Sequence, residues 1–233
     1  FIGGGTKNTV SGDHAFVGGG DGNTAAGSMS FVGGGQGNTA SGTTSSIGGG
    51  NRNTASGEDS FVGGGLNNIA QGRSAVVGGG FRNTASGENS FVGGGRGNTA
   101  SGENSFVGGG LNNIAQGEGA VIAGGMLNNA LGEYSTIPGG VGNVASGTRS
   151  FICGNQGNDG GFSNIFLFGD KGGLGLTAGQ TVGSTGQVAN NSVWFSTMGS
   201  GNTGGDIAYT IFTKEDRTTG VFLSYGDAAW NSV

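Results

Sequence analysis

Apolar and polar residues recur along the first two thirds of the chain with a period of fifteen residues. Ten rows of fifteen, from Phe1 to Ser150, align without a gap, and an eleventh decays after Asn158. We label the positions of a row a to o. Position b is always Val or Ile, position j is Ala except for Val10, and positions d and l are always Gly. A fixed period too short for a helix and its connections predicts an all-β parallel solenoid, or β-roll, with one row per turn.

Each turn has room for two short strands. We expect one around positions o to c, as in Ser105–Gly108, and one around positions h to k, as in Asn98–Ser101, with Gly-rich corners between them. Stacking at the strand spacing of about 4.8 Å makes ten turns a rod of about 48 Å. The row pattern leaves the handedness of the winding open.

The charged residues support this interpretation, because the inside of a solenoid cannot hold them. All charged residues of the first ten rows fall at positions f, g, m or n, which we therefore expect at solvent-facing corners. They are Lys7, Asp13, Asp21, Arg52, Glu58, Asp59, Arg73, Arg82, Glu88, Arg96, Glu103, Glu118, Glu133 and Arg149.

Position a carries a ladder of aromatic residues, Phe1, Phe16, Phe31, Phe61, Phe91 and Phe106. Neighbours along a strand face opposite ways, so either Val and Ile point inward and Phe outward, or the reverse. Both assignments leave an apolar stripe outside. Six exposed Phe would present on the order of 1,000 Å², more than a soluble monomer usually tolerates. Identical rods in register would cover it, so we expect a homo-oligomer, with a trimer favoured.

Composition excludes several classes. Gly makes up 60 of 233 residues but is not spaced every third residue, as collagen requires. The net charge of −5 argues against a nucleic-acid partner, and no apolar run is long enough for membrane insertion. The only cysteine, Cys153, is expected to be a small buried apolar residue.

Position h is Asn in all ten rows: Asn8, Asn23, Asn38, Asn53, Asn68, Asn83, Asn98, Asn113, Asn128 and Asn143. This column is either a ligand-binding ladder or a structural one, and we favour the structural role, because Asn tolerates left-handed backbone angles and stacked amides bond from turn to turn. Thr and Ser at positions i and k resemble an ice-binding face, but pairs such as Ile69/Gln71 interrupt it.

No catalytic, metal or cofactor site is predicted, so we do not expect an enzyme. The Gly-rich rows lack the helix start and Lys of a phosphate loop, and no periodic Asp supplies calcium ligands. A chain with His14 as its one His cannot form a Ser/His/Asp triad.

The repeat S-F-V-G-G-G-x-x-N-T-A-S-G-x-x resembles the head repeat of trimeric autotransporter adhesins over residues 1–158. The Ser or Ala opening, the apolar pair, the Gly after it, the Ala at j and the Gly at l are shared. This chain has one more residue per row and three successive Gly. The resemblance implies a parallel β-roll that trimerises along its length. Similar rows occur in phage tail fibres.

Residues 159–233 are expected to form a second, non-repetitive β domain that caps the shaft or forms its tip. The period is expected to end by Gly160, and a hairpin is expected over Asp206–Tyr225 with its turn at Lys214–Arg217. The final segment resembles the stretch before an endosialidase-type intramolecular chaperone, carried by Trp230, Ser232 and the stopping point. This implies self-cleavage after Val233. Because the chain begins in mid-repeat, we also expect sequence upstream of Phe1.

The favoured function is a structural fibre and attachment protein: the distal part of a homotrimeric phage or phage-like tail fibre. Its expected partners are itself, a host cell-surface glycan or protein, and an upstream fibre or baseplate component. Its expected location is extracellular, on a virion tail fibre or a cell surface. The alternatives are a bacterial surface adhesin of the trimeric autotransporter kind and a glycan-cleaving tailspike. The tailspike would need a facing pair of carboxylates, for which the acids of the last domain show no motif.

Overall fold

The computed structural model describes residues 1–159, 161, 163, 164 and 166–169, and the backbone of four strands further along. These strands are β22 (Ser192–Phe195), β23 (Ile207–Phe212), β24 (Val221–Tyr225) and β25 (Asn231–Ser232). The described part of the chain contains no helix with the length and hydropathy of a membrane span.

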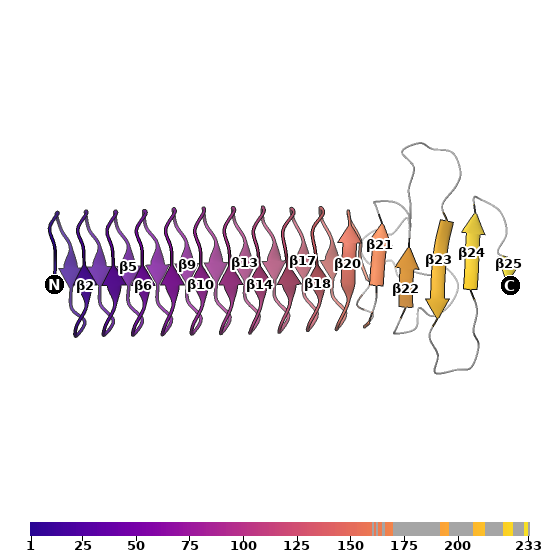
Figure 1. The fold of residues 1–233 in the computed structure, drawn as a ribbon, viewed down its shortest axis with the longest axis horizontal. Helices are drawn as coiled ribbons and strands as arrows, with labels where there is room; N and C mark the ends of the chain where they lie inside the picture. Colours follow the sequence, from indigo (N-terminus) through magenta and orange to yellow (C-terminus); the bar gives the residue numbers. More distant parts are fainter. Residues whose placement is uncertain are drawn as a thin grey trace.

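The repeats wind into a parallel β-solenoid of ten turns, in which each row of fifteen residues is one turn (Figure 1). Every turn pairs with the next at an offset of fifteen residues, as in Phe91↔Phe106 and Thr84↔Thr99. The predicted fold class is confirmed for the solenoid. The strands are shorter than expected, since most comprise only positions a and b or positions i and j.

Two parallel sheets form the walls of the solenoid. The i–j sheet consists of β1 (Thr9–Val10), β3 (Thr24–Ala25), β5 (Thr39–Ala40), β7 (Thr54–Ala55), β9 (Ile69–Ala70), β11 (Thr84–Ala85), β13 (Thr99–Ala100), β15 (Ile114–Ala115), β17 (Asn129–Ala130) and β19 (Val144–Ala145). The a–b sheet contains β2 (Phe16–Val17), β4 (Phe31–Val32), β6 (Ser46–Ile47), β8 (Phe61–Val62), β10 (Val76–Val77), β12 (Phe91–Val92), β14 (Phe106–Val107), β16 (Val121–Ile122), β18 (Thr136–Ile137) and β20 (Phe151–Gly154).

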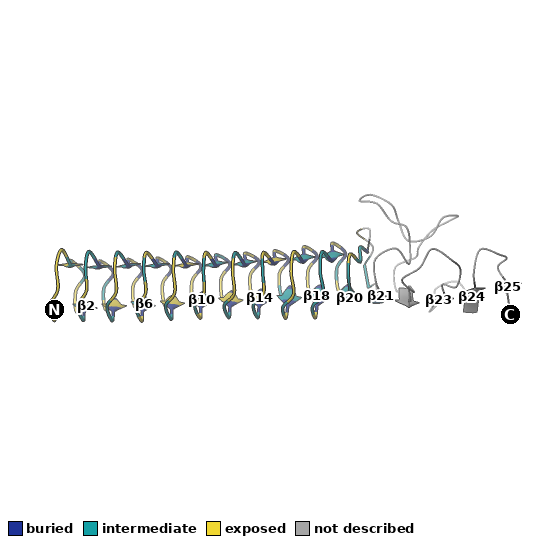
Figure 2. Ribbon diagram, turned by 90° about the horizontal axis from the view of Figure 1, so that it is seen from above, coloured by how far each residue is buried: buried dark blue, intermediate teal, exposed yellow. Residues whose placement is uncertain are grey.

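The core lies between these sheets and has a uniform composition. Val or Ile at position b and Ala at position j are fully buried from Val17 and Ala25 onward, and position o adds buried Ser or Ala. Small Ala side chains on one wall let the two sheets approach closely, which leaves room for one β-branched side chain per turn. Of the two assignments left open by the sequence, the structure therefore has Val and Ile inside and Phe outside. The same pattern of burial repeats from turn to turn (Figure 2).

The corners follow two rules that the row pattern did not reveal. Position f forms a third ladder of isolated parallel bridges, from Thr6↔Asp21 to Val141↔Asn155. Positions g and n carry positive φ angles even where the residue is not Gly, as at Arg82 and Asp59. The left-handed angle thus falls on g and n, not on the Asn at position h, which corrects one reason given for that Asn.

Two Gly positions are required by close packing between turns. A Cβ on Gly102, at position l, would collide with the carbonyl oxygen of Gly117 in the next turn. Gly95, at position e, has φ +85°, and a Cβ there would overlap Gly110. Any larger residue at either position would force successive turns apart.

Buried Asn side chains at position h tie each turn to the next. Asn98 donates from Nδ2 to the carbonyl oxygens of Gly94 at 2.8 Å and Gly110 at 2.9 Å. Its Oδ1 accepts from the backbone N–H of Asn113 at 3.0 Å. The same three bonds recur in almost every turn, and these Asn residues are fully buried from Asn23 onward. The amide thus satisfies corner groups that neither sheet can pair.

The eleventh turn is one residue short between positions a and f, because Thr136 pairs with Phe151 whereas Val141 pairs with Asn155 and Val144 with Asn158. Asp159 therefore occupies the place of the Ala at position j. Its buried carboxylate accepts from the backbone N–H groups of Ser146 at 3.0 Å and Gly147 at 2.9 Å. In earlier turns the carbonyl oxygen at position j accepts these bonds, so Asp159 ends the i–j sheet.

The a–b sheet continues beyond that point. Strand β21 (Phe166–Gly169) pairs in parallel with β20 at the fifteen-residue spacing, Phe151↔Phe166 and Ile152↔Leu167. The expectation that the period ends by Gly160 is therefore wrong by one strand. Cys153, in β20, is half-buried and not fully buried as expected.

Strand β22 pairs in parallel with β21, and β23 pairs in antiparallel fashion with both β22 and β24, which in turn pairs with β25. The pairing of β23 with β24 agrees with the two strands of the expected hairpin. Its turn at Lys214–Arg217, the expected aromatic tip and the proposed cleavage end at Val233 lie outside the described residues.

Replacing Asn98 with Ala is expected to destabilise the solenoid by about 3–4 kcal/mol. The carbonyl of Gly94 and the N–H of Asn113 lose their partner, and the carbonyl of Gly110 keeps only the bond from the backbone N–H of Arg96. Chemical denaturation followed by circular dichroism measures the change. Ser101→Ala, at an exposed position of the same turn, is the matched control and should change stability by less than about 0.5 kcal/mol. Equal losses in both variants would contradict a structural role for the amide.

Candidate interaction surface

The outer face of the a–b sheet carries a longitudinal stripe of apolar side chains, which we call the aromatic face. Its aromatic residues are Phe1, Phe16, Phe31, Phe61, Phe91, Phe106 and Phe151. Phe91 and Phe106 are 36% and 37% exposed, and their rings stack at a centroid distance of 5.2 Å. Ser46 and Thr136 interrupt the stripe, and Val76 and Val121 continue it as smaller apolar residues. This stripe is the largest regular apolar feature on the described surface.

The six Phe residues predicted from the rows all lie on this face. Phe1, Phe16 and Phe31 form a second stack, with centroids 5.5 and 5.4 Å apart. Sequence reasoning missed the end of the stripe, where the rings of Phe151 and Phe166 stack at 4.8 Å. Phe151 and Phe166 both stand at position a of the fifteen-residue register. The row that begins at Phe166 lacks the Asn at position h and the Ala at position j, so the repeat was not followed that far.

The opposite outer face, at position i of the i–j sheet, is built mainly of Thr. Its apolar members Ile69 and Ile114 are 38% and 37% exposed, as much as the Phe residues across the solenoid. They are single residues separated by Thr84 and Thr99. Isolated exposed apolar residues are normal on a protein surface, whereas a continuous stripe calls for a partner.

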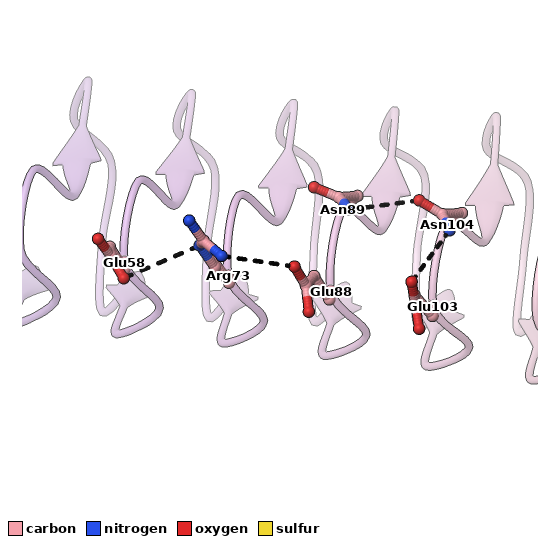
Figure 3. Close-up of polar contacts among 6 residues, drawn as sticks. All are labelled: Glu58, Arg73, Glu88, Asn89, Glu103 and Asn104. Carbon is pink, nitrogen blue, oxygen red and sulfur yellow. Dashed lines mark hydrogen bonds and ion pairs between the residues drawn. The ribbon is translucent and has the colours of Figure 1, made fainter.

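The corners between the two sheets form two edges that run along the rod. We call positions f and g the fg edge, and positions m and n the mn edge. Carboxylates dominate the mn edge, where Arg73 is placed between Glu58 and Glu88 of the adjacent turns at 3.9 and 3.8 Å (Figure 3). All three side chains are about half exposed or more, so these ion pairs contribute little to stability.

Four of the five charged residues of the fg edge are cations, and the edge also carries apolar side chains such as Leu66 and Phe81. The guanidinium groups of Arg82 and Arg96 lie 4.9 and 5.4 Å from the centroid of the Phe81 ring. Nearer the N-terminus, Asp21 accepts a hydrogen bond of 2.7 Å from the Thr6 hydroxyl, which lowers the pKa of its carboxyl. The edge therefore presents positive charge along its middle turns.

Within the described residues, no group of three or more His, Cys, Asp or Glu side chains is placed to hold a metal ion. The surface features available for binding are thus the aromatic face and the two charged edges. Such a surface suits association with another protein surface or with copies of itself.

No protein-family model matches the chain, and no curated protein sequence matches it either. The structure itself shows the class of fold, which is a parallel β-solenoid of fifteen-residue turns.

Tyr134 on the mn edge provides a test of the local electrostatics. Its hydroxyl donates to Glu118 at 2.6 Å, and this bond to a carboxylate raises the pKa of Tyr134 above its ordinary value of 10.0. A raised pKa means that the bond stabilises the fold below pH 10 and that this contribution disappears as the pH rises through the folded-state pKa. We expect the difference in tyrosinate absorbance between the native chain and Tyr134→Phe to titrate above pH 10.

The control is Glu118→Gln, which retains an acceptor but removes the charge and should return the midpoint toward the ordinary value. A native midpoint at or below that value would show that the bond does not form in solution.

Proposed function

We propose that this chain is a structural and attachment protein that forms the distal part of a homotrimeric fibre, as in a phage or phage-like tail fibre. The observation that carries the proposal is the aromatic face, an apolar stripe with Phe or Val at position a in eight of the ten turns of the rod. Ten turns give such a rod a length of about 48 Å. In this proposal the rod supplies length and stiffness, and its end region contacts the host surface.

The size of the aromatic face supports self-association. Four residues of strand and flank at about 3.3 Å each make a band of about 13 Å, so a 48 Å rod offers about 600 Å² per copy. That value is near the 800 Å² per partner of a standard stable interface, and the corner residues beside it would add to it. Three copies around an axis parallel to the rod would cover every stripe along its whole length.

Stiffness follows from the bonding within each chain. Two sheet ladders, the bridges at position f and the Asn amides connect every turn to the next. A rod with four continuous ladders transmits force along its axis without a hinge between turns, which suits a fibre and is not needed for catalysis.

The proposed partners are further copies of this chain, a host cell-surface glycan or protein, and an upstream fibre or baseplate component. The location that follows is extracellular, on a virion tail fibre or a cell surface. A bacterial adhesin of the trimeric autotransporter kind is the second candidate, favoured by the likeness of the repeat itself. The coding sequence beyond Val233 separates the two: a self-cleaving chaperone supports the fibre, whereas a coiled-coil stalk and a membrane anchor support the adhesin.

Exchanging Phe91 and Phe106 for Ser is expected to convert the oligomer to monomer and to lower the melting temperature by about 5–10 °C, because the covered apolar area is lost. Analytical ultracentrifugation gives the oligomeric state. The matched control is Ile69→Ser with Ile114→Ser, equally exposed residues on the opposite face, which should leave a trimer. If the trimer survives the Phe exchange but not the Ile exchange, the interface lies on the outer face of the i–j sheet and not on the aromatic face.

Attachment is tested by binding of the purified chain to an array of bacterial capsular polysaccharides and O-antigen chains. The trimer is expected to bind a subset of them at least about tenfold more tightly than the Phe91→Ser/Phe106→Ser monomer, because three linked sites act together. Failure to bind both the array and intact bacterial cells would leave a structural rod without an attachment role.

A further inference from the structure

The two edges of the solenoid carry opposite charge. In the ten turns, the fg edge has four cations and a single carboxylate, whereas the mn edge has seven carboxylates and two guanidinium groups. Figure 1 shows why these sets stay apart, since the corners of every turn lie on opposite sides of the two sheets. In the described residues, the ion pairs within 4 Å both lie on the mn edge, so the charges of the two edges do not pair within one chain.

The charges are also matched turn by turn. Every turn with a cation on the fg edge has a carboxylate on the mn edge: Lys7 with Asp13, Arg52 with Glu58 and Asp59, Arg82 with Glu88, and Arg96 with Glu103. In three turns the charge is the reverse of the usual one for its edge, and there the other edge is uncharged. These turns pair Asp21 with Ser28 and Met29, Arg73 with Leu66 and Asn67, and Arg149 with Val141 and Gly142. In none of the ten turns do both edges carry the same sign. Glu118 and Glu133 have no cation at their level, and Glu118 instead accepts from Tyr134.

This matching constrains how copies can pack. Both edges border both faces of the solenoid. When copies are related by an axis parallel to the rod, the fg edge of one therefore meets the mn edge of the next at the same height. When two copies face each other across an axis perpendicular to the rod, each edge meets its own kind, and the carboxylates of the mn edge repel each other. Only the parallel arrangement brings the matched charges together.

We propose that copies of this chain associate in parallel and in register, with the fg edge of one copy bound to the mn edge of the next, turn against turn. The inference rests on the proposed trimer, whose axis makes the copies parallel and in register, and adds the edge-to-edge contact and the residues that fix this arrangement. Arg52, Arg82 and Arg96 bind Glu58, Glu88 and Glu103 of the neighbouring copy. These pairs border the aromatic face and orient it.

Arg73 disfavours shifted registers. A slip of one turn in one direction places Arg52 against Arg73 and keeps two attractive contacts, Arg82 with Glu103 and Arg96 with Glu118. A slip in the other direction places Arg82 against Arg73 and Asp21 against Asp13 and keeps only Arg96 with Glu88. In register, four turns make attractive contacts and Arg73 meets the neutral Leu66 and Asn67. A repeat protein needs a contact that fixes the register, because its similar turns would otherwise pack equally well when shifted by one turn.

The experiment uses the full chain with Cys153→Ser and pairs of cysteines joined directly as disulfides by a mild oxidant, because a disulfide needs Cα atoms about 4.4–6.8 Å apart and can therefore distinguish registers that differ by about 4.8 Å. Arg96→Cys with Glu103→Cys tests the same turn, and Arg96→Cys with Glu118→Cys tests a shift of one turn; all three side chains are exposed. We expect the same-turn pair to yield covalent dimers and trimers on a denaturing gel, with a several-fold lower yield from the shifted pair. Each single cysteine should yield monomer only. Adding Arg73→Glu should raise the yield of the shifted pair several-fold.

Two controls separate the possible failures. In the Phe91→Ser/Phe106→Ser background the same-turn pair should give no covalent oligomer, which excludes random collision. If the native chain sediments as a monomer, the proposed oligomer is wrong. If it sediments as an oligomer but the single cysteines join, or the shifted pair joins as well as the same-turn pair, then the oligomer stands and the parallel, in-register contact is refuted.

Discussion

The structure depends on satisfying the backbone in a solenoid whose turns have only two short strands. Each turn has only four residues in its two sheets, and backbone hydrogen bonds between turns satisfy many, but not all, of the carbonyl and N–H groups in the corners. The Asn amide at position h supplies two donors and one acceptor to these groups inside the core. An unpaired buried carbonyl costs about 1–3 kcal/mol, and the problem recurs at every turn. The repeat must therefore keep this Asn even where position a changes from Phe to Ser or Thr.

The same bonding accounts for the abundance of Gly. An amide can bond corner carbonyls on two successive turns only if those turns lie at the sheet spacing, which leaves no room for a Cβ at positions such as Gly95 and Gly102. The solenoid thus relies on hydrogen bonds to the backbone more than on the packing of side chains. Its core is a single row of Val and Ile facing a row of Ala. Because so little apolar surface is buried inside, the apolar residues at position a remain outside, where further copies of the chain are the partner that we propose.

The proposed self-association would account for the regular arrangement of charged and aromatic residues on the described surface. A stripe of Phe binds strongly but is indifferent to direction and to a shift of one turn. The charged edges have the complementary property, because exposed ion pairs add little affinity but penalise wrong pairings. In a fibre built of identical rods, the apolar stripe would therefore supply the affinity between copies, and the charged edges would fix their register.

The sequence by itself determined the period, the number of turns and the columns that hold charge, because a strict repeat with charges at four positions fits only stacked turns. It also established that positions a and b face opposite ways and placed six Phe residues in one column.

The sequence did not decide which of the two columns is inside, since alternation is symmetric. The tertiary structure decided this: Val and Ile at position b are buried in one core with the row of Ala at position j, and the Phe residues at position a lie on the outer face. The ladder at position f and the left-handed corners at g and n were out of reach, because each depends on how turns stack. Phe166 stands in the fifteen-residue register and was missed because the other columns of its row lose the pattern. Asp159 is the clearest case, since its carboxylate caps a sheet only because its own turn is one residue short between positions a and f.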